Sequence, residues 1–147
     1  MHEPNSRYNN NMEKLLCGVD IGGTKLSVGL VSEDGIIHDK IIVYDHVGKT
    51  ETMVVEQIIS LIRQLISQNE LSESDLKGIG IGFPGHVRYR DGHTLTTSNL
   101  KGFKNFPLRQ AIAEHFQIPV LLDNDANAQA FCEYKYGVGR GYESLIF

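Results

Sequence analysis

The chain has 147 residues, of which 41% are hydrophobic and 22% charged, which fits one globular domain or a large piece of a bigger protein. Its net charge of −4 argues against non-specific nucleic-acid binding, which needs a basic face. No apolar run approaches the roughly 20 residues of a membrane span, and the polar, Asn-rich start lacks the apolar core of a signal peptide. We therefore expect a cytoplasmic protein with no nucleic-acid or membrane partner.

The two cysteines, Cys17 and Cys132, stand far apart and have no CxxC partner. Neither a disulfide framework nor a zinc site follows from that spacing. Cys17 lies in an apolar run, where the simplest interpretation is a small buried hydrophobe.

Three strands and a helix fill the first half of the chain. Apolar runs at residues 15–19, 26–32 and 36–44 predict the strands. Glu-Asp-Gly at residues 33–35 predicts a hairpin turn between the second and the third. Apolar side chains then recur at helical spacing over about five turns, which predicts a helix that opens after the polar stretch around residues 47–51 and ends at residues 68–72.

Strands and helices alternate in the second half. The glycine-rich apolar run at residues 79–83 predicts a buried strand that Pro84-Gly85 ends in a turn. Residues 86–106 predict a polar loop with room for a small hairpin around Leu95. Proline suits the first turn of a helix, which predicts one across residues 107–116.

A last strand at residues 120–122 ends in Asp123-Asn124-Asp125, and a helix follows across residues 126–136. The apolar residues 145–147 look like the start of another strand. This order predicts an α/β fold, a mixed sheet of three antiparallel strands followed by helix, strand, helix, strand and helix. Because an apolar strand rarely ends a natural domain, we expect the front part of a longer protein.

The turn between the first two strands, residues 20–25, reads Asp-Ile-Gly-Gly-Thr-Lys. Glycine lets the backbone reach positive φ and lets a ligand approach the main chain. Successive N–H groups in such a turn form a concave anion site, to which Thr24 adds a hydroxyl donor. The pattern predicts a phosphate-binding hairpin, although Gly-Gly between two strands is also a common turn without chemistry.

A dinucleotide-binding site is the competing interpretation of the second glycine-rich segment. Gly80, Gly82 and Gly85 match G-x-G-x-x-G after a strand. The context does not fit, because Pro84 and the polar loop behind it do not open a helix. No acidic residue ends a following strand at the required distance either. We therefore set this interpretation aside.

Four motifs in one order resemble a known family. The hairpin motif is similar to the first phosphate motif of the actin-like ATPases, which include sugar kinases and the heat-shock-protein-70 ATPases. Residues 78–85 (Gly-Ile-Gly-Ile-Gly-Phe-Pro-Gly), 98–103 (Ser-Asn-Leu-Lys-Gly-Phe) and 122–128 (Leu-Asp-Asn-Asp-Ala-Asn-Ala) narrow the resemblance to the ROK family of bacterial sugar kinases and sugar-responsive repressors. The likeness covers residues 15–147 and implies the N-terminal lobe of an actin-like, ribonuclease H-like fold.

The polar, Asn-rich composition predicts a disordered tail at residues 1–13. The resemblance implies an N-terminal α/β lobe at 14–123 and the truncated start of a second lobe at 124–147. The family's second phosphate motif, its adenosine-binding segment and its cysteine-rich structural zinc site would follow Phe147. ROK repressors carry a winged-helix domain before the first motif, so the short tail favours the kinase branch.

For the first motif the resemblance implies ATP and Mg²⁺ as cofactors. Asp20 would hold Mg²⁺ through water, while Thr24 and the amides of Gly22 and Gly23 would contact the phosphates of ATP. Lys25 would either reach a phosphate or stay solvated on its strand.

The resemblance also implies that Asp125 is the catalytic base. Phosphoryl transfer needs an in-line nucleophile and a carboxylate that accepts the hydroxyl proton. Asp125 follows a parallel-type strand, where ligands gather in open α/β sheets. The alternative is that Asp123 and Asp125 cap the following helix, or that the two residues share capping and catalysis.

The resemblance implies that Asn124, Asn99 and Gly85 contact the sugar. An amide offers a donor and an acceptor to sugar hydroxyl groups, and the glycine lets the loop backbone approach. His86 either lines the sugar pocket or is a surface histidine.

The implied reaction is the ATP-dependent phosphorylation of a hexose or an N-acetylhexosamine at the 6-hydroxyl by a glucokinase-like enzyme. The oligomeric state stays open, with a homodimer as one option. The alternative is a non-catalytic sugar sensor, regulator or truncated remnant on the same fold, because half of a cleft does not enclose ATP by itself.

Overall fold

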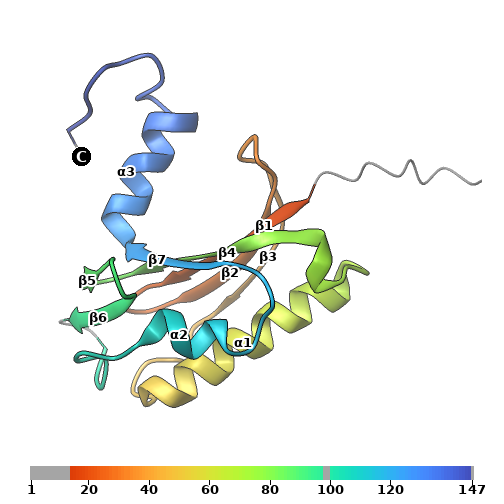
Figure 1. Cartoon of the computed structure of the whole chain (residues 1–147), viewed down its shortest axis with the longest axis vertical. Coiled ribbons are helices and arrows are strands. Elements are labelled where there is room, and N and C mark those ends of the chain that lie inside the picture. Colours follow the sequence, from red (N-terminus) through yellow and green to blue (C-terminus); the bar gives the residue numbers. More distant parts are fainter. Residues whose placement is uncertain (1–13, 98–99, 147) are drawn as a thin grey trace, which may run out of the picture.

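The computed structural model describes residues 14–97 and 100–146. A five-stranded sheet has helices α1 and α2 on one face, while α3 rises from the other side (Figure 1). The strands are β1 (Leu15–Ile21), β2 (Leu26–Val31), β3 (Ile37–Val43), β4 (Leu76–Phe83), β5 (His86–Arg88), β6 (His93–Thr96) and β7 (Val120–Asn124). The helices are α1 (Glu51–Gln68), the short 3-10 helix η1 (Glu73–Asp75), α2 (Leu108–Ala113) and α3 (Asp125–Tyr136).

The strands lie in the order β3-β2-β1-β4-β7 across the main sheet. Short hairpins join β1 to β2 and β2 to β3, so these pairs are antiparallel. β1 pairs with β4, and β4 with β7, in parallel. A parallel pair needs a crossover connection, which α1 and α2 provide. The predicted mixed sheet, with three antiparallel strands first, is confirmed.

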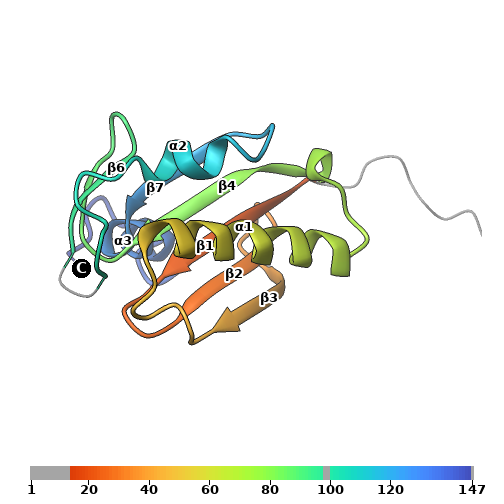
Figure 2. The same cartoon turned by 90° about the horizontal axis from the view of Figure 1, so that it is seen from below.

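The core lies between the sheet and helices α1 and α2 (Figure 2). Because side chains alternate along a strand, one face of β1, β2 and β4 carries the buried apolar side chains. α1 meets that face with an apolar stripe that includes the fully buried Ile58, Ile62 and Leu65. Phe83 and Phe103 close the core at the carboxyl end of β4, with ring centroids 5.4 Å apart.

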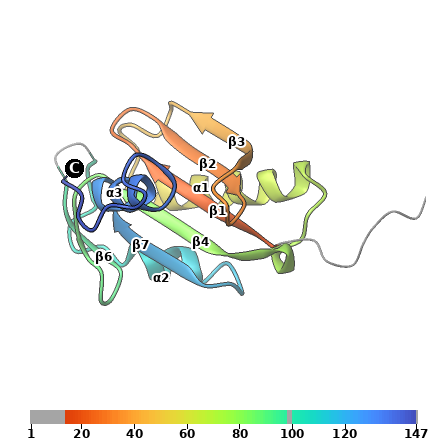
Figure 3. The ribbon, with the colours of Figure 1, turned by 90° about the horizontal axis from the view of Figure 1, so that it is seen from above.

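The opposite face of the sheet, which Figure 3 shows with α3 in front of it, carries a row of glycines. Gly29, Gly18 and Gly80 are register partners on β2, β1 and β4. Among the described residues, no atom outside the local backbone lies within 4 Å of a Cβ placed on Gly18 or Gly80. α3 contributes no buried residue, and its end reaches the β2–β3 hairpin, where the Tyr136 hydroxyl donates to the Glu33 carbonyl at 2.6 Å.

One further predicted element is confirmed, and two differ from the structure. The small hairpin in the predicted loop forms from β5 and β6, with Leu95 inside β6. α2 ends at Ala113, earlier than expected. The strand expected at residues 145–147 is wrong for residues 145–146, which form none, and residue 147 lies outside the described residues. A strand needs a partner for its backbone groups, and no described strand pairs with this segment.

None of the helices within residues 14–97 and 100–146 has the length and apolar character that crossing a membrane requires.

Candidate active site

Three motifs meet at one edge of the sheet, because β1, β4 and β7 are parallel and their carboxyl ends lie side by side. β1 ends at the hairpin of residues 22–25, β4 at Pro84-Gly85, and β7 at the start of α3. Ligands of open α/β sheets bind beyond the carboxyl ends of such strands. The topology therefore brings together segments that lie about a hundred residues apart in the sequence.

Three aspartates lie around Gly82 at this edge. Asp20 on β1 is its register partner on one side, and Asp123 on β7 is its partner on the other. Two strand spacings separate Asp20 from Asp123, about 10 Å between their Cα atoms. The Cα of Asp125 lies 3.5 Å from a Cβ placed on Gly82, which brings this third residue over the middle strand.

The hairpin of residues 22–25 uses one of its amides internally. Gly22 donates its N–H to the carbonyl of Lys25 at 2.8 Å, and a Cβ on Gly22 would lie 2.9 Å from the same oxygen. A side chain at position 22 would therefore open the turn. Thr24 and Lys25 are exposed. Of the two glycine amides expected to contact phosphate, that of Gly22 is engaged within the turn, while that of Gly23 makes no hydrogen bond to a described residue.

A histidine that the sequence did not single out supports the hairpin. His46 is fully buried, and its Nε2 lies 2.8 Å from the carbonyl oxygen of Gly22. A carbonyl oxygen only accepts, so Nε2 carries the proton. One histidine in a polar connection gives no periodicity or motif from which this contact could be found.

Asn124, and neither aspartate, is the N-cap of α3. Its Oδ1 accepts the N–H of Asn127 at 3.1 Å. Asp125 is the first residue of the helix and, among the described residues, accepts only the N–H of Ala126, at 2.9 Å. Asp123 accepts the side-chain amide of Asn127. The alternative that Asp123 or Asp125 is the helix cap is therefore wrong.

The carboxylate of Asp125 has a free oxygen. Its Oδ1 makes the contact to Ala126, and Oδ2 has no hydrogen-bond partner within the described residues. The side chain is half-buried and stands in the first turn of α3, where the positive end of the helix dipole favours a negative charge. This environment holds a carboxylate that is open to a substrate hydroxyl group.

The turn after β4 is held by side chains from both neighbouring segments. Asn124 Nδ2 donates to the carbonyl of Gly85 at 2.9 Å, and the Thr97 hydroxyl donates to the carbonyl of Pro84 at 2.7 Å. A Cβ on Gly85 would collide with the carbonyl oxygen of Thr96. Gly85 is thus required by the packing of the chain itself, and the Asn124 amide already bonds protein through both its ends.

The remaining predicted sugar contacts are Asn99 and His86. Asn99 lies outside the described residues. The segment that follows it is anchored by Phe103, which is buried and whose carbonyl accepts the Thr94 hydroxyl at 2.9 Å. His86 is exposed on β5 and shares a hydrogen bond of 2.9 Å with the Thr96 hydroxyl, the surroundings of a surface histidine.

The carboxylate of Asp20 is a suitable ligand for a magnesium ion whose other ligands are water molecules and phosphate oxygens. Its side chain is exposed, and its two register partners, Ser27 and Gly82, leave room around the carboxylate. Mg²⁺ is commonly bound by one or two carboxylates together with substrate phosphates. Within residues 14–97 and 100–146 no group of three or more His, Cys, Asp or Glu side chains forms a metal site by itself.

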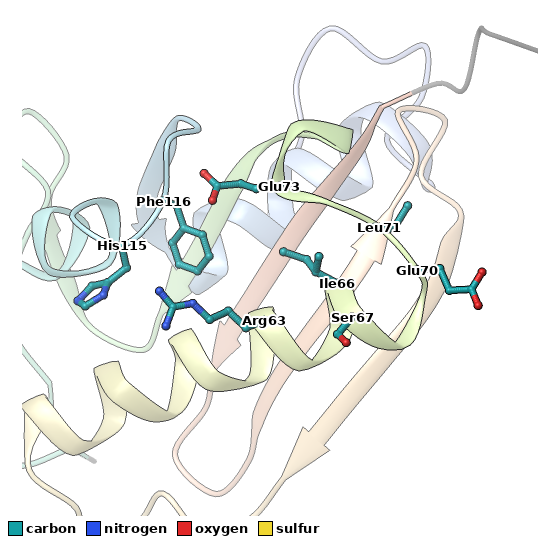
Figure 4. A pocket seen from close by; sticks show the side chains of 8 residues that line it. All are labelled: Arg63, Ile66, Ser67, Glu70, Leu71, Glu73, His115 and Phe116. Carbon is teal, nitrogen blue, oxygen red and sulfur yellow. The ribbon is translucent and has the colours of Figure 1, made fainter.

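A pocket of about 480 Å³ lies away from these carboxylates (Figure 4). It is lined by the end of α1, by the segment that leads from α1 into β4, and by the segment that leads from α2 into β7, at the amino edge of the sheet. Its lining includes the cation of Arg63 and the carboxylates of Glu70 and Glu73. Arg63 packs over the ring of Phe116, 5.9 Å from its centroid. None of the sequence motifs contributes to this pocket.

Comparison with known proteins agrees with this geometry. A glucokinase from Thermotoga maritima is 36% identical over 136 residues, which cover 92% of this chain and 41% of that enzyme. A ROK family glucokinase from Streptomyces griseus, solved with glucose and AMPPNP, has a TM-score of 0.76 and 31% identity over 86% of this chain and 38% of its own. A xylose repressor from Caldicellulosiruptor bescii is 28% identical over 132 residues, 90% of this chain and 33% of the repressor.

The sheet order and this structural similarity define the class of fold, the N-terminal lobe of an actin-like ATPase of the sugar-kinase type. The model of the ROK family matches residues 16–147. The chain belongs to the ROK family. It spans about 40% of the length of the glucokinases that it matches.

Proposed function

We propose that this chain supplies the phosphate hairpin and the catalytic base of a glucokinase-like enzyme. The reaction is transfer of the γ-phosphoryl group of ATP to the 6-hydroxyl of a hexose or an N-acetylhexosamine. The observation that carries the proposal is the meeting of Asp20, the following hairpin and Asp125 around Gly82. Two glucokinases whose similarity covers 88% and 92% of this chain support the proposal.

The hairpin would bind the phosphates of ATP. Gly23 and Thr24 supply the N–H groups and the hydroxyl donor, since the Gly22 amide is engaged in the turn. Lys25 is exposed and would add positive charge. Asp20 would hold Mg²⁺ through water, and the bound ion would neutralise charge on the transferring phosphoryl group.

Asp125 would accept the proton of the attacking hydroxyl group. Its free Oδ2 supports this role, as does its position next to the strand that ends in the Pro84-Gly85 turn. Asn124 would offer a sugar only the second lone pair of Oδ1, because its amide nitrogen is already bonded to Gly85. Asn99 remains a proposed sugar contact by its place in the motif.

We also propose that residues 14–123 form the first lobe and residues 124–147 begin the second. The absence of buried side chains on α3, among the residues described, supports this division, because a helix normally buries one face. A substrate held between two lobes would be shielded from water.

A sugar-responsive regulator is the second candidate, since a xylose repressor matches over 90% of the chain. Such a protein would bind sugar without consuming ATP. The free carboxylate of Asp125 favours the kinase, because sugar binding alone needs no open base.

Sugar-dependent ADP release by the whole protein that carries these residues tests the proposal, over a panel of hexoses and N-acetylhexosamines with Mg·ATP. We expect turnover with a sugar from this panel. Asp20→Ala should raise the KM for Mg·ATP and leave sugar affinity unchanged, with Glu56→Gln on the exposed side of α1 as the control. Sugar binding with no ADP release would favour the regulator, and equal loss of both affinities would contradict the division of roles.

A further inference from the structure

The turn of the phosphate hairpin is closed in an unusual way. In a two-residue hairpin the residues that flank the turn normally exchange two backbone hydrogen bonds. Here Gly22 N–H donates to the Lys25 carbonyl, but the companion bond from Lys25 N–H to the Gly22 carbonyl is not formed. The Gly22 carbonyl accepts Nε2–H of His46 at 2.8 Å instead.

This exchange of partners changes the number of hairpin N–H groups that are available to a ligand. The amides of Gly23, Thr24 and Lys25 make no backbone hydrogen bond to any residue that the structure describes. Three successive N–H groups form the concave arrangement that binds a phosphate group. A turn closed in the usual way would retain only two of them.

The imidazole ring of His46 is fixed in the orientation that makes this bond. It is fully buried, and its Nδ1 is buried without a hydrogen-bond partner in the described part of the chain. The ring therefore has one hydrogen bond to make, and rotating it away from Gly22 would lose that bond without gaining another.

The backbone that carries His46 is itself tied to α1. Lys49 donates its N–H to the His46 carbonyl at 3.2 Å, and its ammonium group contacts Asp45 at 3.1 Å and the side chain of Gln57 at 3.0 Å. Gln57, on α1, donates in turn to Asp45 at 2.6 Å. A closed set of three side chains thus holds the segment beside the hairpin.

We propose that His46 is a positioning residue that replaces the Lys25 amide at the Gly22 carbonyl and so keeps three hairpin amides open for a phosphate group. The proposal rests on the proposed function of the hairpin. His46 acts through Gly22 and touches no substrate.

Two variants of the whole protein that carries these residues test the step. His46→Phe keeps a ring of similar size and removes the donor, while His46→Gln keeps an N–H group that reaches as far as Nε2. Ile62→Val, on the buried face of α1, is the control for a general loss of stability. Should the Phe variant fail to fold, His46→Asn, whose amide is too short to reach Gly22, takes its place.

The first measurement is hydrogen exchange of the Lys25 amide by ¹⁵N NMR, without any ligand. We expect fast exchange in the wild type, the Gln variant and the Val control, and slowing by about tenfold or more in the Phe variant as Lys25 N–H closes onto Gly22. Equal exchange in the wild type and the Phe variant would overturn the inference.

The second measurement is titration with Mg·AMPPNP, followed at the same amides. We expect the signals of Gly23, Thr24 and Lys25 to shift in the wild type, and the Kd to rise about tenfold in the Phe variant but stay within about threefold in the Gln variant. An unchanged Kd in the Phe variant would overturn the inference and leave the proposed function standing. No shift in the wild type would count against the proposed function, and the exchange measurement would still decide the role of His46.

Discussion

Substitution of Asn124 separates two contributions that this side chain makes at the start of α3. Its Oδ1 caps the helix by accepting the Asn127 N–H, and its Nδ2 holds the Gly85 carbonyl at 2.9 Å. The cap contributes about 1 kcal/mol, and the hydrogen bond about another 1 kcal/mol. Asn124→Ala should therefore lower the free energy of unfolding by about 2 kcal/mol, or the Tm by about 4–8 °C for a chain of this size.

Asn124→Asp distinguishes the two contributions, because aspartate is as good a cap as asparagine but has no N–H for Gly85. It should cost about 1 kcal/mol, half of the loss in the Ala variant. The assay is urea unfolding followed by far-UV circular dichroism, since the chain has no tryptophan. An Asp variant as stable as the wild type would refute the contribution of the Gly85 contact. An Asp variant as unstable as the Ala variant would refute the cap.

Three further outcomes follow from the packing and the charges. Gly85→Ala should cost about 3 kcal/mol or more, because its Cβ would meet the Thr96 carbonyl oxygen, whereas Gly80→Ala should stay within about 1 kcal/mol; equal urea midpoints would contradict this. Burial raises the pKa of the Cys17 thiol to about 12, so a thiol reagent at pH 8 should label exposed Cys132 at once and Cys17 only after unfolding. Two fast thiols would contradict that burial. The hydrogen bond from Gln57, followed by that from Lys49, lowers the pKa of Asp45. A carboxyl group whose pKa is lower in the folded than in the unfolded state stabilises the fold at pH values above its unfolded pKa, about 4. This contribution is lost as the pH falls through the folded-state pKa. The stability difference between wild type and Asp45→Asn should therefore shrink below about pH 4, and a difference that is constant with pH would contradict this contribution.

Most of the fold could be predicted because its signals are local. The apolar stripe of α1 repeats over five turns, and the Gly35 turn and the alternating strands around it set the antiparallel hairpins. The order of strands β1, β4 and β7 follows from two helical crossovers. The expected strand at residues 145–147 rested on three apolar residues, and none of the described strands pairs with Leu145 or Ile146.

Only those site residues that belong to a sequence motif could be predicted. The order of motifs gave Asp20 and Asp125, and the fold brings both to the Gly82 region. The motifs did not distinguish Asn124 from its neighbouring aspartates as the helix cap, because both asparagine and aspartate are common caps. The contact between His46 and Gly22 joins residues 24 positions apart, and it depends on how the segment after β3 folds back. No sequence pattern reports such a contact.

The most direct test of phosphoryl transfer at this site compares wild type with Asp125→Asn in the whole protein that carries these residues. The measured quantity is sugar-dependent ADP release. Removal of a general base lowers kcat by about a hundredfold or more, while a neutral amide of the same shape leaves the sugar site in place. We expect that loss together with sugar affinity within about twofold of the wild type. Wild-type turnover in the variant would contradict the assignment of Asp125 as the base. Loss of sugar binding from a folded variant would make Asp125 a binding residue instead.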